Sequence, residues 1–273
     1  MPEGDSIYRA AQALHRALAG KTVTSFETVL PKLARIDDDT PLKGRMIERV
    51  ISAGKNLIIA FSGDLHLHTH MKMNGSWHIY RPGERWQRPH RDMRIVIETA
   101  DFVAVAFTVP VAEFHTSRSL ARDENLRRIG PDLLGTTFDR AEALRRIREH
   151  PDEEIANVLL NQRVIAGIGN IWKSETLFDA GIDPFTHVAD LDDTQLDRII
   201  ASALRLLRRS AEGRAEFAVY SRGGDPCRKC RTPIRYRKQG EDARGTYWCP
   251  VCQRSAGVSP AAGGRPARRP ARR

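Results

Sequence analysis

The amino-acid sequence predicts an α+β protein of several domains, in which a domain rich in β-strands is followed by a helical domain and a small metal-binding hairpin. Three observations support this prediction. Short apolar segments, separated by glycine, proline and aspartate, run through residues 22–108. Helical spacing takes over after about residue 119, and two Cys-x-x-Cys pairs lie near the end. We expect domains over residues 1–118, 119–218 and 219–253, followed by a disordered basic tail over residues 254–273.

The chain opens with Met1-Pro2-Glu3, directly before residues 4–19, whose apolar side chains have helical spacing. A small residue after the initiator methionine favours removal of that methionine, which would leave Pro2 with a free amine. An α-amine titrates near pH ~8 and a lysine near ~10.4, so more of the amine is unprotonated at neutral pH. Such an amine can form an iminium with an aldehyde-level carbon, and Glu3 could move protons beside it. The alternative is a disordered start without a role.

Strand signals follow over residues 22–30, 45–51, 56–61, 64–70, 93–98 and 102–108, as in a β-sandwich or barrel. Lys55 follows Ala53-Gly54 at an expected strand-to-strand turn, where most lysines are simply solvated.

Three histidines alternate within one of these strands and therefore share one of its faces: His66, His68 and His70. They could bind a metal ion or line a surface or cavity. No carboxylate or further histidine nearby has an obvious role, which favours the second interpretation.

Helical segments are expected over residues 138–149, 152–161, 171–180 and 194–210. Between the second and third lies a short apolar link that contains Gly167-Ile168-Gly169-Asn170 and leads directly into a helix. Free backbone N–H groups at a helix start bind anions, phosphate included. The turn could also be purely structural.

The four cysteines form two pairs, Cys227 with Cys230 and Cys249 with Cys252, separated by eighteen residues. This spacing is typical of a structural tetrahedral zinc site. The residues between the pairs suit a β-hairpin, with residues 240–245 near its tip and Arg244 at an exposed turn.

The net charge of +10 is concentrated near the end of the chain. The last twenty residues hold six arginines and no acidic residue, which leaves +4 for the rest. Between Arg205 and Lys238, eleven Lys or Arg accompany only three acidic residues. A basic stripe of this density is typical of a nucleic-acid-binding surface, although a solvated surface can look the same.

No apolar run approaches the ~20 residues of a membrane span, and the start lacks the apolar region of a signal peptide. We therefore expect a cytoplasmic protein without a membrane partner, and a monomer.

Four features together resemble one family: Met-Pro-Glu-Gly-Asp at the start, a β domain, the motif Gly-Ile-Gly-Asn-Ile-Trp-Lys-Ser-Glu over residues 167–175, and a terminal four-cysteine hairpin. They are similar to the formamidopyrimidine-DNA glycosylase/endonuclease VIII family over residues 1–253. The resemblance implies an N-terminal β-sandwich, a helical domain with a helix–two-turns–helix motif, and a C-terminal β-hairpin zinc finger with one structural Zn²⁺. It also implies a nucleoid-associated bacterial enzyme whose partner is damaged double-stranded DNA.

The resemblance implies a bifunctional DNA glycosylase and AP lyase. Pro2 would attack C1′ of a damaged nucleoside and Glu3 would be the acid or base beside it. Lys55 would assist elimination and contact phosphate, and Arg244 would grip phosphate at the lesion.

A glycosylase must take the damaged nucleotide out of the base stack, which requires a wedge and grips on the DNA backbone. By resemblance, residues 71–77 form the loop that fills the gap, with Met73 as the apolar wedge next to Lys72. Asn170 and Arg128 would be further phosphate contacts.

One departure bears on the substrate. Relatives that act on formamidopyrimidines carry an Arg-Phe pair that reads the opposite base, and residues 107–115 contain no such pair. Together with Tyr247-Trp248-Cys249-Pro250, this favours the endonuclease VIII branch and oxidised pyrimidines. The loop between the cysteine pairs is slightly longer than usual, which affects the placement of Arg244.

Two alternatives remain open from the sequence. The same chemistry could act on oxidised purines. A non-catalytic zinc-finger DNA-binding protein would need neither Pro2, Glu3 nor Lys55, and all three are present.

Overall fold

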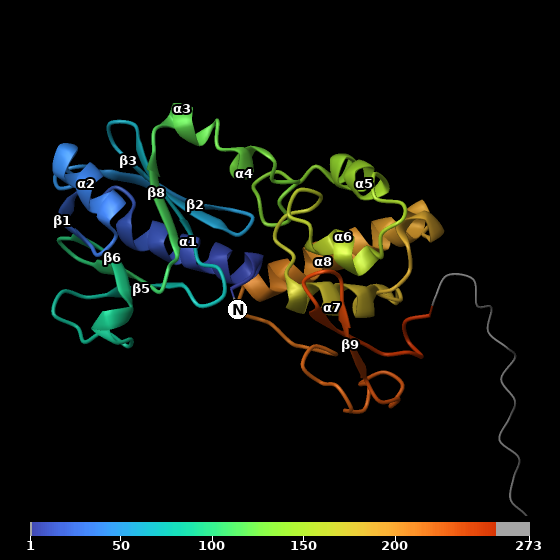
Figure 1. The fold of residues 1–273 in the computed structure, drawn as a ribbon. Coiled ribbons are helices and arrows are strands. Elements are labelled where there is room, and N and C mark those ends of the chain that lie inside the picture. Colours follow the sequence, from blue (N-terminus) through green and yellow to red (C-terminus); the bar gives the residue numbers. More distant parts are fainter. Residues whose placement is uncertain (1, 255–273) are drawn as a thin grey trace, which may run out of the picture.

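The computed structural model describes residues 2–254 and confirms the predicted α+β architecture. A β-sandwich forms one half of the molecule, and a helical domain with a β-hairpin against it forms the other (Figure 1). The N-terminus lies where the two halves meet. Of the predicted tail, only Arg254 lies within the described residues, and it forms a parallel bridge with Ile182 instead of being disordered.

The β-sandwich consists of two four-stranded antiparallel sheets, with strand orders β1-β6-β7-β5 and β2-β3-β4-β8. Apolar side chains from both sheets and from helix α1 form one buried core. The strands are β1 (Val23–Thr28), β2 (Ile47–Ala53), β3 (Asn56–Phe61), β4 (Leu65–His70), β5 (Ser76–Tyr80), β6 (Met93–Thr99), β7 (Val103–Phe107) and β8 (Val111–His115).

Helix α1 (Gly4–Leu18) is amphipathic, and its apolar side, which includes Ile7 and Leu14, is buried in the sandwich core. The helix also packs against α8 of the helical domain. Ser6 fixes its start, because the Ser6 hydroxyl accepts from the Glu3 N–H at 2.8 Å and donates to the Glu3 carbonyl at 2.9 Å. The residues before the helix are therefore held in place between the two halves.

Sequence patterns missed the strands β5 and β8 and the helix α2 (Pro31–Asp39). Strand β5 has only five residues, with Ser76 and His78 on the face opposite Trp77, and β8 follows Pro110 directly and mixes Glu113 with histidine and phenylalanine. Helix α2 buries only Leu33, so it has almost no apolar periodicity to detect.

The helical domain contains α3 (Ser117–Leu120), α4 (Glu124–Arg127), α5 (Arg140–Arg148), α6 (Ile155–Leu160), α7 (Asn170–Ala180) and α8 (Asp193–Ala211), with 3₁₀ turns at His90–Asp92 in the sandwich and Val188–Asp190 here. Asp139 caps α5, since its carboxylate accepts from the Glu142 N–H at 2.9 Å. Helix α8 is capped by Asp192 in the same way, and Gly169 is the N-cap residue of α7. A second apolar core lies among α5 to α8.

The C-terminal hairpin pairs β9 (Arg235–Gln239) with β10 (Arg244–Trp248), and β10 packs on α7. A small core of Phe178, Val219 and Ile234 joins the hairpin to α7. Within residues 2–254, no helix combines the length and apolar character that crossing a membrane requires.

Candidate active site at the N-terminus

Glu3 is almost fully buried, at 1% exposure, although a glutamate with an ordinary pKa is charged at neutral pH. Its carboxylate oxygens accept hydrogen bonds from the backbone N–H groups of Ile171 at 2.8 Å and Trp172 at 3.2 Å. These groups belong to the first turn of α7, which has no partner for them within the helix. The Glu3 carboxylate therefore occupies the N–H groups at this helix start, which the sequence left open as a possible anion site.

Two glycines allow this approach. A Cβ atom on Gly169 would lie 2.2 Å from Cδ of Glu3, and one on Gly4 would lie 2.5 Å from the Gly167 carbonyl oxygen. The Gly4 N–H donates to that carbonyl at 3.0 Å. The link between α6 and α7 is therefore in direct backbone contact with the start of the chain.

Asp5 makes a second bond between the two halves. Its carboxylate accepts from the Trp172 indole N–H at 2.9 Å and from the Ser210 hydroxyl at 2.5 Å, and the residue is buried. The position of the N-terminus therefore depends on α7 and α8 as much as on the sandwich.

Lys55 lies in the two-residue turn between β2 and β3, as predicted. Gly54 has a φ of +57°, which favours glycine there. The Gly54 N–H donates to Oδ2 of Asp132 at 2.7 Å, and Oδ1 of Asp132 accepts from the Leu134 N–H at 3.0 Å. A carboxylate of the helical domain thus holds the turn that carries Lys55.

Most of the predicted catalytic and DNA-contacting residues line a single cavity of about 250 Å³. The cavity receives residues from the N-terminus, the sandwich, the helical domain and the hairpin. Its lining is Pro2, Lys55, His70, Lys72, Met73, Leu160, Asn170, Asp242 and Arg244.

Burial and charge shift the protonation of two groups at this cavity. Burial raises the pKa of the Glu3 carboxyl, against the opposing effects of the two N–H groups of α7 and of the Lys55 charge. Burial also lowers the pKa of the Lys55 ammonium group, which Glu3 opposes and Arg244 reinforces. Both shifts bring the neutral forms closer to physiological pH, as general acids and bases require.

The loop after β4 projects the one apolar side chain that the sequence singled out there. Met73 is 52% exposed, so its side chain is free to contact a partner. Lys72 has a φ of +49°, and its N–H donates to Nδ1 of His70 at 3.0 Å. His70, which the sequence left between metal ligand and cavity lining, is a lining residue, and its burial lowers the pKa to about 4.

Asn170 and Arg244 approach the cavity from α7 and β10. Asn170 is buried, and its Nδ2 donates to the Gly245 carbonyl at 2.9 Å, which ties the helix to the hairpin. Arg244 is the first residue of β10 rather than a residue of the turn, and it lies 3.4 Å from Asp242. Arg128 does not line this cavity; it is exposed at the end of α4 and lies 3.3 Å from Glu124.

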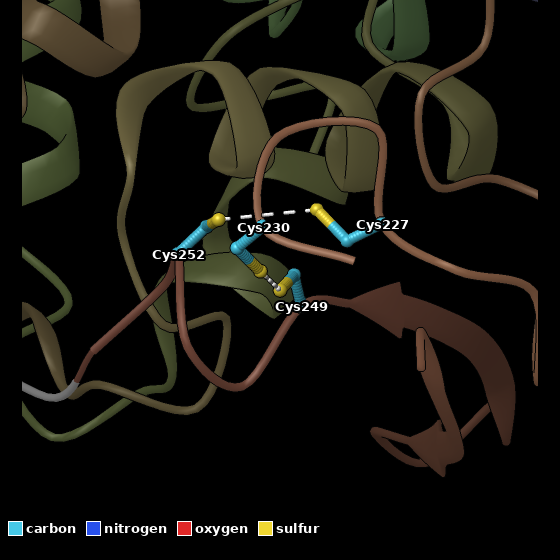
Figure 2. A group of neighbouring side chains, drawn as sticks. All are labelled: Cys227, Cys230, Cys249 and Cys252. Atoms are coloured by element: carbon cyan, nitrogen blue, oxygen red, sulfur yellow. Dashed lines mark hydrogen bonds between the residues drawn. The ribbon is translucent and has the colours of Figure 1, made fainter. Parts of the chain in front are cut away.

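The four cysteines converge at the base of the hairpin (Figure 2). Their Sγ atoms all lie within 4.8 Å of one another, with Cys227 and Cys252 at 3.8 Å and Cys230 and Cys249 at 3.4 Å. A tetrahedral ion with metal–sulfur bonds of ~2.3 Å separates its sulfur ligands by about 3.8 Å. The cluster therefore fits one metal ion, and none of the four thiols is in a disulfide.

Sequence reasoning missed Lys173 of α7, which is fully buried. Its Nζ donates to Oγ1 of Thr246 at 2.8 Å, and that hydroxyl donates to Oε1 of Gln239 at 2.7 Å. Burial lowers the Lys173 pKa to about 8, Glu3 opposes this shift and Arg244 adds to it. A lysine in the motif over residues 167–175 looks like any helix surface residue in the sequence, so no local signal marked it.

Replacing Lys173 with Met should stabilise the fold at pH 7 by about 1–3 kcal/mol, because the folded state then no longer has to bury an ammonium group. Below pH 8, Lys173 is protonated in both the folded and the unfolded state, so the full free-energy cost of burying its charge destabilises the fold. It disappears as pH rises toward the ordinary lysine value of 10.5, since the neutral amine is then present in both states. Thermal unfolding at pH 7, 9 and 10.5 should show the advantage of the variant shrinking; a constant difference would contradict this account.

The fold combines a β-sandwich, a helical domain and a four-cysteine hairpin, and the buried Glu3 lies between the sandwich and the helical domain. This arrangement is that of a protein with a helix–two-turns–helix (H2TH) domain. Residues 1–110 match the model of the formamidopyrimidine-DNA glycosylase N-terminal domain, and residues 129–220 match that of the formamidopyrimidine-DNA glycosylase H2TH domain. The chain belongs to the formamidopyrimidine-DNA glycosylase/endonuclease VIII family.

Relatives cover the full length of the chain. A probable endonuclease 8 2 of Streptomyces coelicolor is 38% identical, with all of both chains covered. A DNA-(apurinic or apyrimidinic site) lyase Nei2 of Mycolicibacterium smegmatis is also 38% identical, over 93% of this chain and 99% of that protein. Endonuclease 8 of Escherichia coli K12 is 31% identical, over 93% of this chain and all of that protein.

Solved structures share the fold. Lactococcus lactis Fpg in complex with DNA that contains an abasic site superposes with a TM-score of 0.81 at 22% identity, over 93% of this chain and all of that one. MutM in complex with DNA containing carbocyclic 8-oxo-G gives the same values.

Proposed function

We propose that this protein is a bifunctional DNA glycosylase and AP lyase of base excision repair that acts through a Schiff base at Pro2. The observation that carries the proposal is the gathering of Pro2, Lys55 and Arg244 around one cavity, with the carboxyl group of Glu3 buried next to it. A non-catalytic DNA-binding protein would have no use for a buried Glu3 with a raised pKa next to a Lys55 whose pKa is lowered.

In this proposal, Met1 is removed and the lone pair of the Pro2 amine forms a bond to C1′ of the damaged nucleoside. The damaged base departs with the electrons of the glycosidic bond, and the nitrogen loses its proton. The C1′–O4′ bond then opens, O4′ takes its electrons and a proton, and the nitrogen lone pair forms the iminium, which makes the C2′ protons more acidic. Glu3 moves protons at the sugar, since burial raises the pKa of its carboxyl group and so favours the protonated form more than in a solvated glutamate. Lys55, whose lowered pKa makes its neutral amine more accessible, assists the elimination that cuts the strand.

The DNA would be held mainly through its phosphates. Lys72, Asn170 and Arg244 line the cavity from three different elements and would grip the backbone around the extruded nucleotide. The exposed Met73 would fill the space left in the base stack. Arg128, exposed and outside the cavity, would contact a more distant phosphate.

We propose oxidised pyrimidines as the substrate class. The link between β7 and β8 has only three residues, and Val109 in its middle is fully buried in the sandwich core. It therefore offers no arginine or aromatic side chain to read the opposite base. The full-length similarity to proteins named endonuclease 8 points the same way.

A cleavage panel tests this choice. Duplexes with thymine glycol or dihydrouracil should be cut at least about tenfold faster than a matched duplex with 8-oxoguanine. Much faster release of 8-oxoguanine would favour the oxidised-purine alternative, and binding without any cleavage would favour a non-catalytic role.

We further propose that the four cysteines hold one structural zinc ion, which would supply folding energy and no reactive position. The supporting observations are the all-sulfur donor set and the separations close to those of tetrahedral zinc. We also propose the domain boundaries at residues 118 and 218, and a monomer that works on DNA in the bacterial cytoplasm.

Replacing Cys249 with Ser should remove the zinc and lower DNA affinity together, because the hairpin that positions Arg244 then loses its base. Arg244→Ala should keep the zinc yet weaken DNA binding by about 1–3 kcal/mol, and its binding should depend less on salt, since one phosphate contact is lost. Metal analysis and binding at several salt concentrations separate the two effects. Zinc-free wild-type protein with full affinity would refute the role of the metal.

A further inference from the structure

A second group of possible metal ligands lies on the outer face of the β2-β3-β4-β8 sheet. Strands β4 and β8 are antiparallel, and their register places His68 directly opposite Glu113 and His66 opposite His115. Directly paired residues share a face, and so do residues two apart in one strand. His68, Glu113 and His115 each offer one ligand atom, and these atoms all lie within 4.8 Å of one another.

The sequence interpretation of the three alternating histidines was wrong about their partners. It found no carboxylate or further histidine near them, because Glu113 and His115 are more than forty residues away and belong to a strand that was not predicted. Of the three alternating histidines, only His68 takes part in the group.

The hydrogen bonds of His68 leave one of its nitrogens with a free lone pair. Nε2 of His68 lies 2.9 Å from the Oδ1 atom of Asn56, which can only accept, so Nε2 carries the proton. Nδ1 is therefore the unprotonated nitrogen, and it is buried without a hydrogen-bond partner. Burial, with His115 nearby, also lowers the His68 pKa, although Asp123 and Glu113 oppose this shift.

His115 shows the same pattern. Its Nδ1 lies 3.4 Å from Oγ of Ser119, whose own proton goes to the Thr116 carbonyl at 3.2 Å. Nδ1 is therefore the donor, and the lone pair is on Nε2. Nε2 is buried, has no hydrogen-bond partner, and lies 3.7 Å from Oε2 of Glu113.

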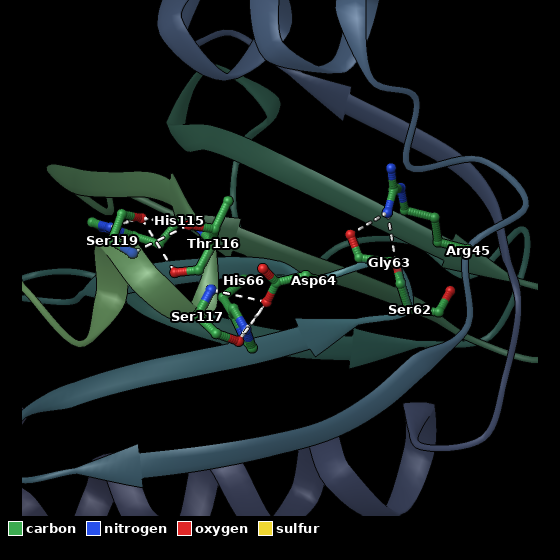
Figure 3. Close-up of polar contacts among 9 residues, drawn as sticks. All are labelled: Arg45, Ser62, Gly63, Asp64, His66, His115, Thr116, Ser117 and Ser119. Atoms are coloured by element: carbon green, nitrogen blue, oxygen red, sulfur yellow. Dashed lines mark hydrogen bonds and ion pairs between the residues drawn. The ribbon is translucent and has the colours of Figure 1, made fainter.

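The neighbouring polar residues are already paired. His66 contacts Ser117 at 3.0 Å and Asp64 at 3.5 Å, and His115 lies beside Ser119 and Thr116 (Figure 3). Asp64 in turn accepts from the Ser117 N–H at 2.9 Å. Apart from Glu113 beside His115, the two bare nitrogens of His68 and His115 have no hydrogen-bond or ion-pair partner among the described residues.

We propose that His68, His115 and Glu113 bind a divalent transition-metal ion of the zinc class, at a site separate from the four cysteines. Two imidazoles and one carboxylate suit zinc, cobalt and nickel, and an Asn56 or Ser119 bond on the far side of each ring is the usual way to orient such a ligand. The Glu113 side chain is 51% exposed, so it can change rotamer and bring a carboxylate oxygen to the ion.

The site joins β4 to the last strand of the sandwich, just before the segment with α3 and α4 that leads into the helical domain. Asp123, the N-cap of α4, is close enough for its negative charge to raise the pKa of His68, against the larger effect of burial. The ion would therefore fix the end of β8 and the start of this connecting segment, and its binding would stabilise the folded state.

The test uses the full-length protein with its cysteine site filled by zinc, titrated with Co²⁺ and Zn²⁺. Wild type should bind one further ion per chain, and the added Co²⁺ should lack thiolate charge-transfer absorption. His115→Ala should abolish this binding, and Glu113→Gln should weaken it by about tenfold or more. Because Glu113 is exposed, Glu113→Gln keeps the test valid even if His115→Ala folds poorly.

Two matched variants serve as controls. Glu27→Gln changes an exposed glutamate on a strand of the other sheet, and His78→Ala changes a histidine on β5. Both should bind the second ion like wild type. Wild-type protein that takes up no metal beyond the cysteine site, or a Glu113→Gln variant with unchanged affinity, would overturn the proposal.

Discussion

Protein that retains Met1, or that carries an uncleaved N-terminal tag, is expected to bind damaged DNA but leave it uncut. Any residue in front of Pro2 converts its amine to an amide, whose nitrogen has no available lone pair. Cleavage should fall by more than about 10³-fold, the scale on which loss of a covalent nucleophile acts. Binding should persist, because Lys72, Asn170 and Arg244 still line the cavity.

Borohydride trapping provides the measurement. The mature enzyme should become linked to DNA as a reduced Schiff base, and the linked peptide should begin at Pro2. Pro2→Gly is a softer variant, since a glycine amine can still react slowly. Full cleavage by protein that mass spectrometry shows to retain Met1 would rule out Pro2 as the nucleophile.

The sequence predicted those helices and strands in which apolar residues recur with the period of the element and face the core. Helix α1, six of the strands and the long helices α5, α7 and α8 lie close to the expected ranges, as does the four-cysteine hairpin. Strand β8 was missed because it has only five residues, its outer face carries Glu113 and His115, and none of its residues is fully buried.

Sequence motifs named most residues of the candidate site, but they did not indicate the contacts that hold these residues together. Pro2, Lys55 and Arg244 came from motifs, and the structure places them around one cavity. The Asp132 carboxylate under the Gly54 turn and the buried Lys173 left no local signal. Each depends on a contact between segments more than seventy residues apart, and no period or motif encodes such a contact.

Replacing Gly169 with Ala is expected to impair base excision about as severely as Glu3→Gln, a loss of about 10²–10⁴-fold. The backbone of Gly169, at φ −119° and ψ −165°, is one that alanine adopts without strain. The obstacle is space, since the new Cβ would lie 2.2 Å from Cδ and 2.5 Å from Oε1 of Glu3. Either Glu3 or the start of α7 must move, and the bond from the Ile171 N–H to Glu3 breaks in both cases.

Gly223→Ala is the matched control, because its backbone φ is outside the left-handed region and an added Cβ would meet only ordinary contacts of 3.4 Å and more. It should fold and excise like wild type.

The double variant Gly169→Ala with Glu3→Gln decides whether Gly169 acts through Glu3. Gln has nearly the same shape as Glu, so the clash remains while the proton-moving group is already gone. If the alanine harms catalysis only by displacing Glu3, the double variant should be no slower than the slower single one, as for two residues that act as a unit. Losses that multiply would show that Gly169 serves another purpose, such as letting a phosphate approach the start of α7. Single-turnover excision rates on one lesion duplex, with binding measured in parallel, distinguish these outcomes.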